Sequence, residues 1–138
     1  MRFNKQKGFT LIELVIIIVV LGILASVAIP KYKSIVAESR EASCRGALGG
    51  LRSGISIFYA NTAVTTGTAT WPVMDSLRTA GVVMEQSLPT NPYQTNAPDS
   101  IVTGVTKGTI VGTRGGWAYK PSTGEIWANT NSVGENSW

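Results

Sequence analysis

The hydrophobic and polar positions divide this 138-residue chain into four stretches with different periods. Residues 1–8, MRFNKQKG, are short and basic, and residues 9–30 are almost continuously apolar. Residues 31–60 repeat apolar positions every three or four residues, which is the period of an amphipathic helix. Residues 61–138 contain short apolar runs between clusters of Gly, Pro, Asn, Ser and Thr, which are typical of a small turn-rich domain.

The apolar stretch predicts a membrane helix. From Leu14 to Ile29 the chain reads LVIIIVVLGILASVAI without a charge. With the apolar residues Phe9 to Ile12 before it, the run approaches the roughly 20 residues that cross a bilayer. The basic flank predicts that the N-terminus stays in the cytoplasm while the rest of the chain is exported. We therefore expect a single span of the inner membrane.

The helical period continues beyond the apolar stretch as one stripe of an amphipathic helix: Tyr32, Ile35, Val36, Ser39, Ala42, Ser43, Ala47, Leu48, Leu51, Ile55, Phe58 and Tyr59. A helix from Phe9 to about Ala60 would be roughly 78 Å long at 1.5 Å per residue. A small globular domain cannot cover that length. The first half of the helix therefore needs lipid or identical helices as its neighbours.

Glycine and proline disturb this expected rod. Pro30 removes a backbone donor and Gly22 weakens the helix eight residues earlier, so we expect a bend or a loosened stretch between them. Further along, four glycines each cost about 0.8 to 1 kcal/mol in an exposed helix and require close packing on the sheet or on a neighbouring subunit: Gly46, Gly49, Gly50 and Gly54. Without that packing the helix would end before Gly49.

The remaining residues predict an α+β head. A Thr-rich loop over residues 61–70 ends the long helix, and a short helix follows from Trp71 or Pro72 to about Ala80, with Gly81 as its stop. A period of two from Ser100 onward predicts strands at residues 101–105, 109–112, 117–120 and 125–129, the last two joined as a hairpin by residues 121–124. We expect a three- or four-stranded antiparallel sheet on the C-terminal half of the long helix.

Two aromatic residues of the expected hairpin, Trp117 and Tyr119, share one face of their strand, which favours packing on the helix over a ligand cage. Trp127 alternates with Ile126 and Ala128 on the partner strand and should point to the opposite side.

Composition argues against an enzyme or a metalloprotein. The chain has no His, so it lacks the commonest general base and metal ligand, and we expect no catalytic residue, no metal site and no cofactor. A calcium site is disfavoured because Glu125 and Glu135 are the only acids after Asp99. The single Cys44 cannot form an intrachain disulfide. The net charge of +4 depends on Arg2, Lys5 and Lys7, since the balance without these three is 9 minus 8, or +1, so nucleic-acid binding is not supported.

Glu13 separates the possible roles of the N-terminus. A secretory signal cut after Ala28 and a plain single-span anchor both account for the apolar run, but neither explains an acid near one end of it. A carboxylate costs about 2.5 to 3.5 kcal/mol at the bilayer centre and less near the interface, and such residues usually mark function. Cleavage between Gly8 and Phe9 would place a new α-amino group four residues before Glu13, as a charge partner.

The segment Lys7-Gly8-Phe9-Thr10-Leu11-Ile12-Glu13-Leu14, with the apolar run ending at Pro30, strongly resembles the class III signal of type IV pilins and type II secretion pseudopilins. The resemblance implies a ladle-shaped fold and removal of residues 1–8 by a prepilin peptidase. It also implies N-methylation of Phe9 and retention of residues 9–30 as the membrane and filament-core helix. In that family the carboxylate at the position of Glu13 pairs with the N-terminal amine of a neighbouring subunit during assembly, and the interval from Gly22 to Pro30 can partly unwind.

The resemblance favours a structural subunit that self-associates into a helical filament for adhesion, motility or DNA uptake. Its expected partners are the prepilin peptidase and methyltransferase, the assembly platform of the inner membrane, and the lipid bilayer before assembly. The alternative is a pseudopilin of a type II secretion system, with a short periplasmic filament. An electron-conducting fibre and a monomeric periplasmic binding module, starting at Ile29, remain further alternatives.

Overall fold

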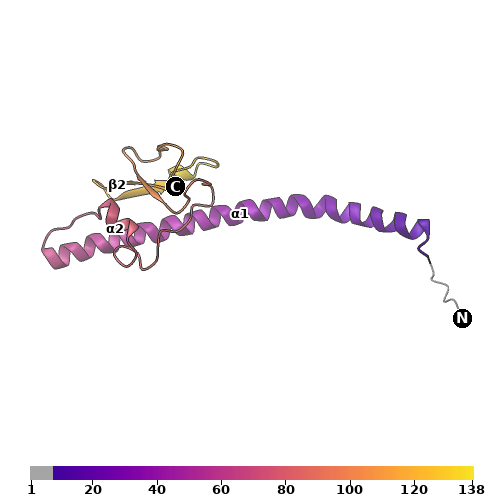
Figure 1. Ribbon diagram of the computed structural model, residues 1–138, viewed down its shortest axis with the longest axis horizontal. Coiled ribbons are helices and arrows are strands. Elements are labelled where there is room, and N and C mark those ends of the chain that lie inside the picture. Colours follow the sequence, from indigo (N-terminus) through magenta and orange to yellow (C-terminus); the bar gives the residue numbers. More distant parts are fainter. Residues whose placement is uncertain (1–7) are drawn as a thin grey trace, which may run out of the picture. The chain divides into compact units, whose positions relative to one another are not determined.

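The structure, a computed structural model, describes residues 8–138, and the first seven residues of the expected leader lie outside the described residues. Its elements in chain order are α1 (Leu11–Thr66), α2 (Met74–Arg78), β1 (Ile101–Thr103), β2 (Trp117–Lys120), β3 (Glu125–Ala128) and a short 3₁₀ helix, η1 (Glu135–Ser137). The described residues divide into two compact units, one up to Glu38 and one from Ser39 to Trp138. The predicted α+β class is confirmed, with a long N-terminal helix and a small sheet (Figure 1).

The long helix extends further than the sequence predicts. We expected residues 61–70 to be a loop, but α1 continues to Thr66. The threonines of this turn bond helix carbonyls instead of ending the helix, as the Thr65 hydroxyl does to Asn61 O (2.8 Å) and the Thr66 hydroxyl to Thr62 O (2.7 Å). Gly67 follows at φ +75°, and its N–H donates to Ala63 O at 3.1 Å, so this glycine ends the helix.

The second helix is shorter than expected. We predicted residues 71 or 72 to about 80, and α2 comprises Met74–Arg78 alone. Val73 before it is extended and forms no side-chain cap, which leaves the first turn weakly defined. The chain then turns through Gly81 at φ +82°, where we expected the stop.

The sheet has three strands in the order β1-β2-β3, and its pairing is mixed. β2 and β3 form the predicted antiparallel hairpin, with Ala118 opposite Trp127. β1 runs parallel to β2, with Ile101 opposite Trp117, so the prediction of a fully antiparallel sheet is wrong. Residues 104–116 return the chain to the same end of the sheet, which is the long connection that a parallel pair requires.

The strand predicted at residues 109–112 does not form. The backbone groups that a strand would pair with its neighbour form hydrogen bonds with side chains instead. Thr109 O accepts from Trp127 Nε1 (2.8 Å), and Val111 N donates to Asn129 Oδ1 (2.7 Å). Gly108 and Gly112 also have positive φ angles, 82° and 64°, which bend the chain out of a strand.

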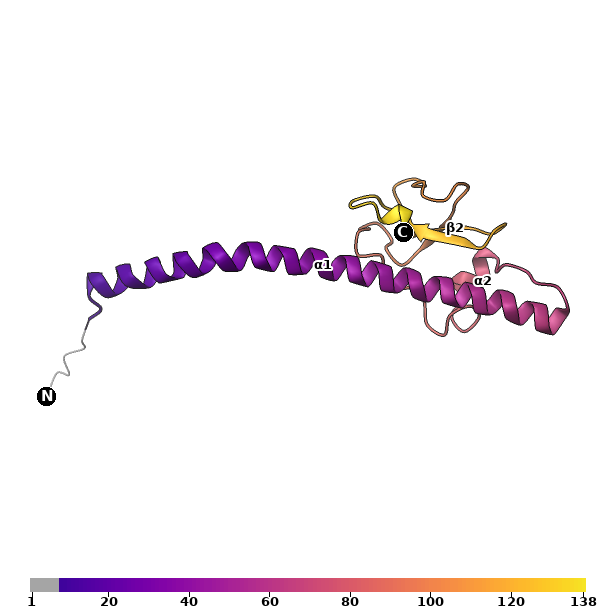
Figure 2. The ribbon, with the colours of Figure 1, turned by 180° about the vertical axis from the view of Figure 1, so that it is seen from behind.

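The core lies between the sheet and the C-terminal part of α1 (Figures 1 and 2). Its buried members come from α1, α2 and all three strands: Cys44, Leu48, Leu51, Ile55, Leu77, Ile101, Trp117, Tyr119, Ile126 and Ala128. The predicted faces of the hairpin are therefore confirmed, with Trp117 and Tyr119 packed in the core. Trp127, on the other side, covers Gly104 so closely that a Cβ at this glycine would clash with the indole ring.

Candidate functional site

Glu13 lies in the first turn of α1 and is held by Thr10. The Thr10 backbone N–H and hydroxyl both donate to Glu13 Oε2, at 2.9 and 2.6 Å. In return, the Glu13 N–H donates to the Thr10 hydroxyl oxygen at 3.3 Å. This reciprocal arrangement is a capping box, which satisfies backbone donors at the start of a helix.

The capping box gives Glu13 a partner that sequence reasoning missed. The apolar run contains no cation, but the hydroxyl and N–H of Thr10 already engage the carboxylate. The signal was present, since Thr-x-x-Glu before an apolar run is a common helix-start pattern. Both hydrogen bonds go to Oε2, and within residues 8–138 no hydrogen bond or salt bridge engages Oε1. Oε1 is therefore open to a further donor.

The expected processing junction precedes the helix. Gly8 and Phe9 lie before the first residue of α1, and both are exposed. Phe9 has 78% of its surface exposed. A peptidase requires an accessible backbone outside regular structure at its cleavage site, and this segment provides one.

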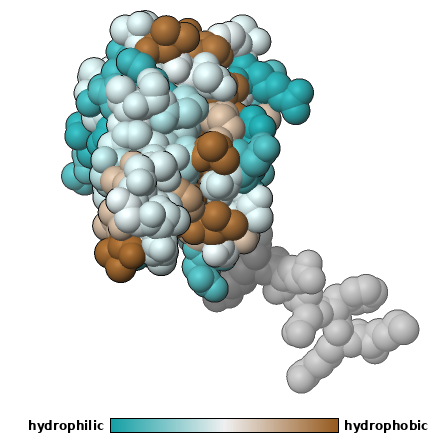
Figure 3. All heavy atoms as spheres, turned by 90° about the vertical axis from the view of Figure 1, so that its left-hand side faces the viewer, coloured by the Kyte–Doolittle hydropathy of each residue, from teal (hydrophilic) through white to brown (hydrophobic). Residues whose placement is uncertain are grey.

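The apolar stretch of α1 leaves its side chains uncovered. Every large hydrophobic residue from Leu11 to Ile29 is at least 42% exposed, and there are fourteen of them. Burying a fully exposed side chain of this kind contributes about 1.5 to 3 kcal/mol, so covering these half-exposed ones would contribute on the order of 10 to 20 kcal/mol. Among the described residues, α1 is the one helix long and apolar enough to cross a membrane. Exposed apolar side chains also occur in the second unit, such as Val64 and Val82. On the face that Figure 3 shows, hydrophobic groups are interspersed with hydrophilic ones.

The expected bend residues both lie inside α1. The helix is continuous through Gly22 and Pro30, so the single chain shows no loosened stretch between them. The proline leaves the carbonyl of Ser26 without its usual partner. The Ser26 hydroxyl donates to the carbonyl of Ile23 at 2.7 Å. A bend at this point remains a prediction.

The four glycines of the amphipathic stretch have different surroundings. Gly54 packs closely, since an added Cβ would lie 2.8 Å from the carbonyl oxygen of Val83. Gly46 and Gly49 are exposed, and an added Cβ would meet no atom within 4 Å. The helix nevertheless continues past Gly49. Packing within the chain therefore accounts for Gly54 but not for Gly46 and Gly49.

Cys44 and Tyr119 are buried in the core of the second unit. Cys44 is fully buried in the core, and this burial raises the pKa of its thiol to about 11. At neutral pH the thiol is therefore protonated and a poor nucleophile. Burial likewise raises the pKa of Tyr119 to about 12, and its hydroxyl donates to Pro72 O at 2.8 Å. The Tyr119 hydroxyl thus ties β2 to the segment before α2, and the Cys44 thiol packs in the core.

Comparison with known proteins connects this N-terminus to a family. The family model described as the prokaryotic N-terminal methylation motif matches residues 3–29. The chain is 42% identical over 67 residues to the fimbrial protein EcpC of Eikenella corrodens, a match that covers 49% of this chain and 40% of that protein. It is 46% identical over 52 residues to the type IV major fimbrial protein FimA of Dichelobacter nodosus, covering 38% and 33% of the two chains. It is 36% identical over 83 residues to the type IV major pilin protein PilE of Neisseria gonorrhoeae, covering 60% and 45%.

These matches span less than half the length of each of these relatives. No solved structure is significantly similar to the chain. The names of the relatives agree with the methylation motif and with the exposed apolar helix. Residues 3–29 of the chain thus carry the prokaryotic N-terminal methylation motif, and the chain is similar over its N-terminal part to fimbrial proteins and type IV pilins.

Proposed function

We propose that this protein is a structural subunit of a type IV pilus-type filament and assembles through the apolar part of α1. The observation that carries the proposal is the uncovered surface between Leu11 and Ile29. A bilayer covers this surface before assembly, and the same helices of neighbouring copies cover it in the filament. Both environments remove the apolar side chains from water, so the subunit can pass from one to the other at modest cost.

The mature subunit begins at Phe9 in this proposal. A prepilin peptidase removes residues 1–8 on the cytoplasmic side, and the new terminus at Phe9 is methylated. The methylation motif over residues 3–29 and the exposure of Gly8 and Phe9 support this order of events. The helix and the head then stay together as one exported subunit, held in the inner membrane until the assembly platform adds it to the filament.

Glu13 sets the register between neighbouring subunits in this proposal. Its Oε2 remains engaged by Thr10, while Oε1 accepts the α-amino group of an adjacent Phe9. Capping and pairing therefore do not compete for the same oxygen. In a low-dielectric environment an amine paired with this carboxylate is worth more than in water, and a missing partner costs correspondingly more.

The pseudopilin of a type II secretion system is the less favoured alternative. Both kinds of subunit share the N-terminal architecture, but the relatives that match this chain carry the names fimbrial protein and pilin. Long surface fibres that contain this chain at normal expression would agree with the pilus. A short periplasmic filament alone would agree with the pseudopilus.

Substitutions of Glu13 test the proposed register. Glu13→Gln keeps the side-chain shape and can still accept the hydrogen bonds of a capping box, but it removes the charge. Glu13→Ala removes both. We expect both variants to be cleaved after Gly8 as efficiently as the wild type, and both to lose most of their sheared surface fibres. The matched control is Glu38→Gln, which changes an exposed acid outside the apolar stretch and should leave fibre yield unchanged.

Normal fibre yield from both Glu13 variants would refute the pairing with the amine. Normal yield from Glu13→Gln alone, with none from Glu13→Ala, would assign Glu13 to capping and not to subunit registration.

A further inference from the structure

The head contains a cavity that assembly through α1 does not use. It has a volume of about 420 Å³ and lies between the end of α2, the start of β1 and the loop that carries Arg114. This size is within the range of about 300 to 1,000 Å³ that is usual for small-molecule sites. All the lining residues belong to the second compact unit.

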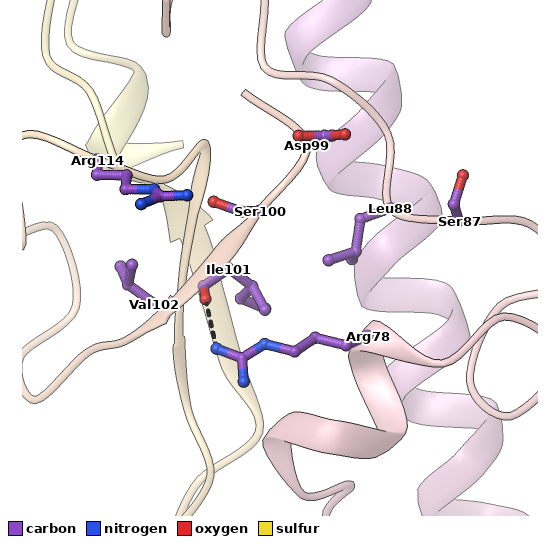
Figure 4. A pocket seen from close by; sticks show the side chains of 8 residues that line it. All are labelled: Arg78, Ser87, Leu88, Asp99, Ser100, Ile101, Val102 and Arg114. Atoms are coloured by element: carbon purple, nitrogen blue, oxygen red, sulfur yellow. Dashed lines mark hydrogen bonds between the residues drawn. The ribbon is translucent and has the colours of Figure 1, made fainter. Parts of the chain in front are cut away.

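Two guanidinium groups enter the cavity from different elements (Figure 4). Arg78, at the end of α2, is fixed by a hydrogen bond from Nη2 to Ile101 O at 3.1 Å. Its Nη1 lies 3.6 Å from the exposed carboxylate of Asp75. The guanidinium of Arg114 forms no hydrogen bond or salt bridge with any other residue in the range 8–138. Since each guanidinium carries five N–H donors, both retain donors for a ligand.

Hydrogen bonds hold the backbone around Arg114 in place. Asn129 is buried, and its side-chain amide donates to the carbonyl of Arg114 at 3.2 Å and to that of Gly115 at 3.2 Å. The Asn129 amide also accepts the N–H of Val111 at 2.7 Å and donates to the carbonyl of Val111 at 3.0 Å. On the other side, the N–H of Gly115 donates to Asn96 O at 3.0 Å. The backbone position of Arg114 is thus fixed before any ligand arrives, while its side chain is exposed.

The rest of the lining restricts the chemistry of the ligand. Asp99 supplies a carboxylate that accepts hydrogen bonds from hydroxyl groups. Ser87 and Ser100 add hydroxyl groups, while Leu88 and Val102 supply apolar surface. The charge of the lining is +1, from two arginines and one aspartate. A ligand with one carboxylate, several hydroxyl groups and an apolar ring face satisfies every part of this lining.

We propose that this cavity binds a uronic acid, a sugar ring that carries one carboxylate. Its carboxylate is held by the guanidinium groups of Arg114 and Arg78, and its ring hydroxyls donate to Asp99. The C–H face of the ring packs on the apolar side chains. The sugar is either a free acid or one unit of an acidic polysaccharide, since both present the same group.

Saturation-transfer difference NMR on the full-length protein in detergent micelles tests this site, with galacturonate as the probe. We expect a saturable signal from the ring protons of galacturonate, a weaker one from its neutral methyl ester, and none from glucose. A galacturonate trimer that competes with the free acid would identify the polysaccharide as a source, and failure to compete would restrict the site to the free sugar.

Arg114→Gln is the informative variant, because its guanidinium makes no bond within the described residues that folding would miss. We expect it to weaken galacturonate binding about tenfold or more, the usual effect of losing a charge-assisted hydrogen bond. Lys107→Gln is the matched control, since it removes the same charge from an exposed position outside the lining and should leave binding unchanged. No saturable galacturonate signal, competition by inorganic phosphate at equal concentration, or equal loss in both variants would overturn the proposal.

Discussion

Glu135 offers a prediction whose size follows from the structure. Its side chain is fully buried beside the C-terminus. Oε1 accepts the N–H of Ser132 at 2.8 Å, and Oε2 accepts the N–H of Val133 at 2.7 Å. The substitution Glu135→Gln preserves the shape of the side chain. It replaces one acceptor by an NH₂ group that must face a backbone donor.

The cost of this change comes from the hydrogen bonds. A hydrogen bond to a charged group contributes about 1.5 to 3 kcal/mol to stability. In the variant, the NH₂ group of the glutamine also faces a backbone N–H, and two facing donors raise the cost further. We therefore expect Glu135→Gln to destabilise the fold by about 2 to 4 kcal/mol. For a head of this size each kcal/mol shifts the Tm by about 4 to 8 °C, so the Tm should fall by roughly 10 to 30 °C.

The acid dependence of stability has a definite sign. Burial alone would raise the pKa of Glu135, but backbone N–H donors, including those of Ser132 and Val133, and the Thr130 hydroxyl outweigh it, so its pKa lies below the usual value. The stabilisation is therefore fully present above the unfolded-state pKa of about 4.3, and it is lost as the pH falls through the lower folded-state pKa. The Gln variant should lack this component of acid sensitivity.

Thermal melts of the full-length protein in detergent micelles, from pH 7 to pH 3, measure both effects. The fluorescence of the buried Trp117 and Trp127 reports unfolding of the head. Glu85→Gln, at an exposed position, is the matched control and should melt like the wild type. If Glu135→Gln keeps the wild-type Tm and the wild-type loss of stability in acid, the hydrogen bonds of Glu135 do not stabilise the head.

Four further substitutions test the packing and the helix start. Gly49→Ala should stabilise the second unit by about 0.5 to 1 kcal/mol in chemical denaturation, because the added Cβ meets open space. Gly54→Ala should destabilise it, because the added Cβ would lie 2.8 Å from a backbone carbonyl oxygen. The opposite order of stabilities would contradict the placement of the helix. Gly104→Ala should cost about 1 to 3 kcal/mol, since the added methyl would overlap the Trp127 ring, and an unchanged denaturation midpoint would show that the ring is free to move. Thr10→Val removes the capping box but keeps the Glu13 charge, so hydrogen exchange in the first turn of α1 should speed up, and unchanged protection would show that the cap is not formed.

The helical parts of the fold could be predicted because their signals are local and repeated. The apolar run and the three–four spacing specify α1, and the buried faces of Leu48, Leu51 and Ile55 agree with the predicted stripe. The hairpin of β2 and β3 followed from the alternation of its residues. The end of α1 was placed too early, because threonines that favour a loop in isolation bond helix carbonyls here, and Gly67 ends the helix instead.

The parallel pairing of β1 could not be predicted, because it depends on distant contacts. The side chains of Asn129 and Trp127 form hydrogen bonds with backbone groups of residues 109–111. These backbone groups are then not available to pair with another strand. No local pattern indicates such a partner. The cavity beside Arg114 has the same origin, since its lining comes from segments between residues 78 and 114 that only the fold brings together.

At the candidate assembly site, the sequence indicated a functional acid but not the hydrogen bonds that this acid makes. Glu13 stood out as an acid in an apolar run, and the structure adds its bonds with Thr10. The exposure of residues 11–29 then shows how much apolar surface an assembly partner must cover.

The central claim is that the apolar helix survives maturation and is buried between copies in a filament. Intact-mass and N-terminal analysis of the subunit in sheared surface fibres tests it most directly. We predict a chain that starts at a methylated Phe9 and retains residues 9–30. A mature soluble monomer that starts at Ile29, with no fibre containing residues 9–28, would contradict it.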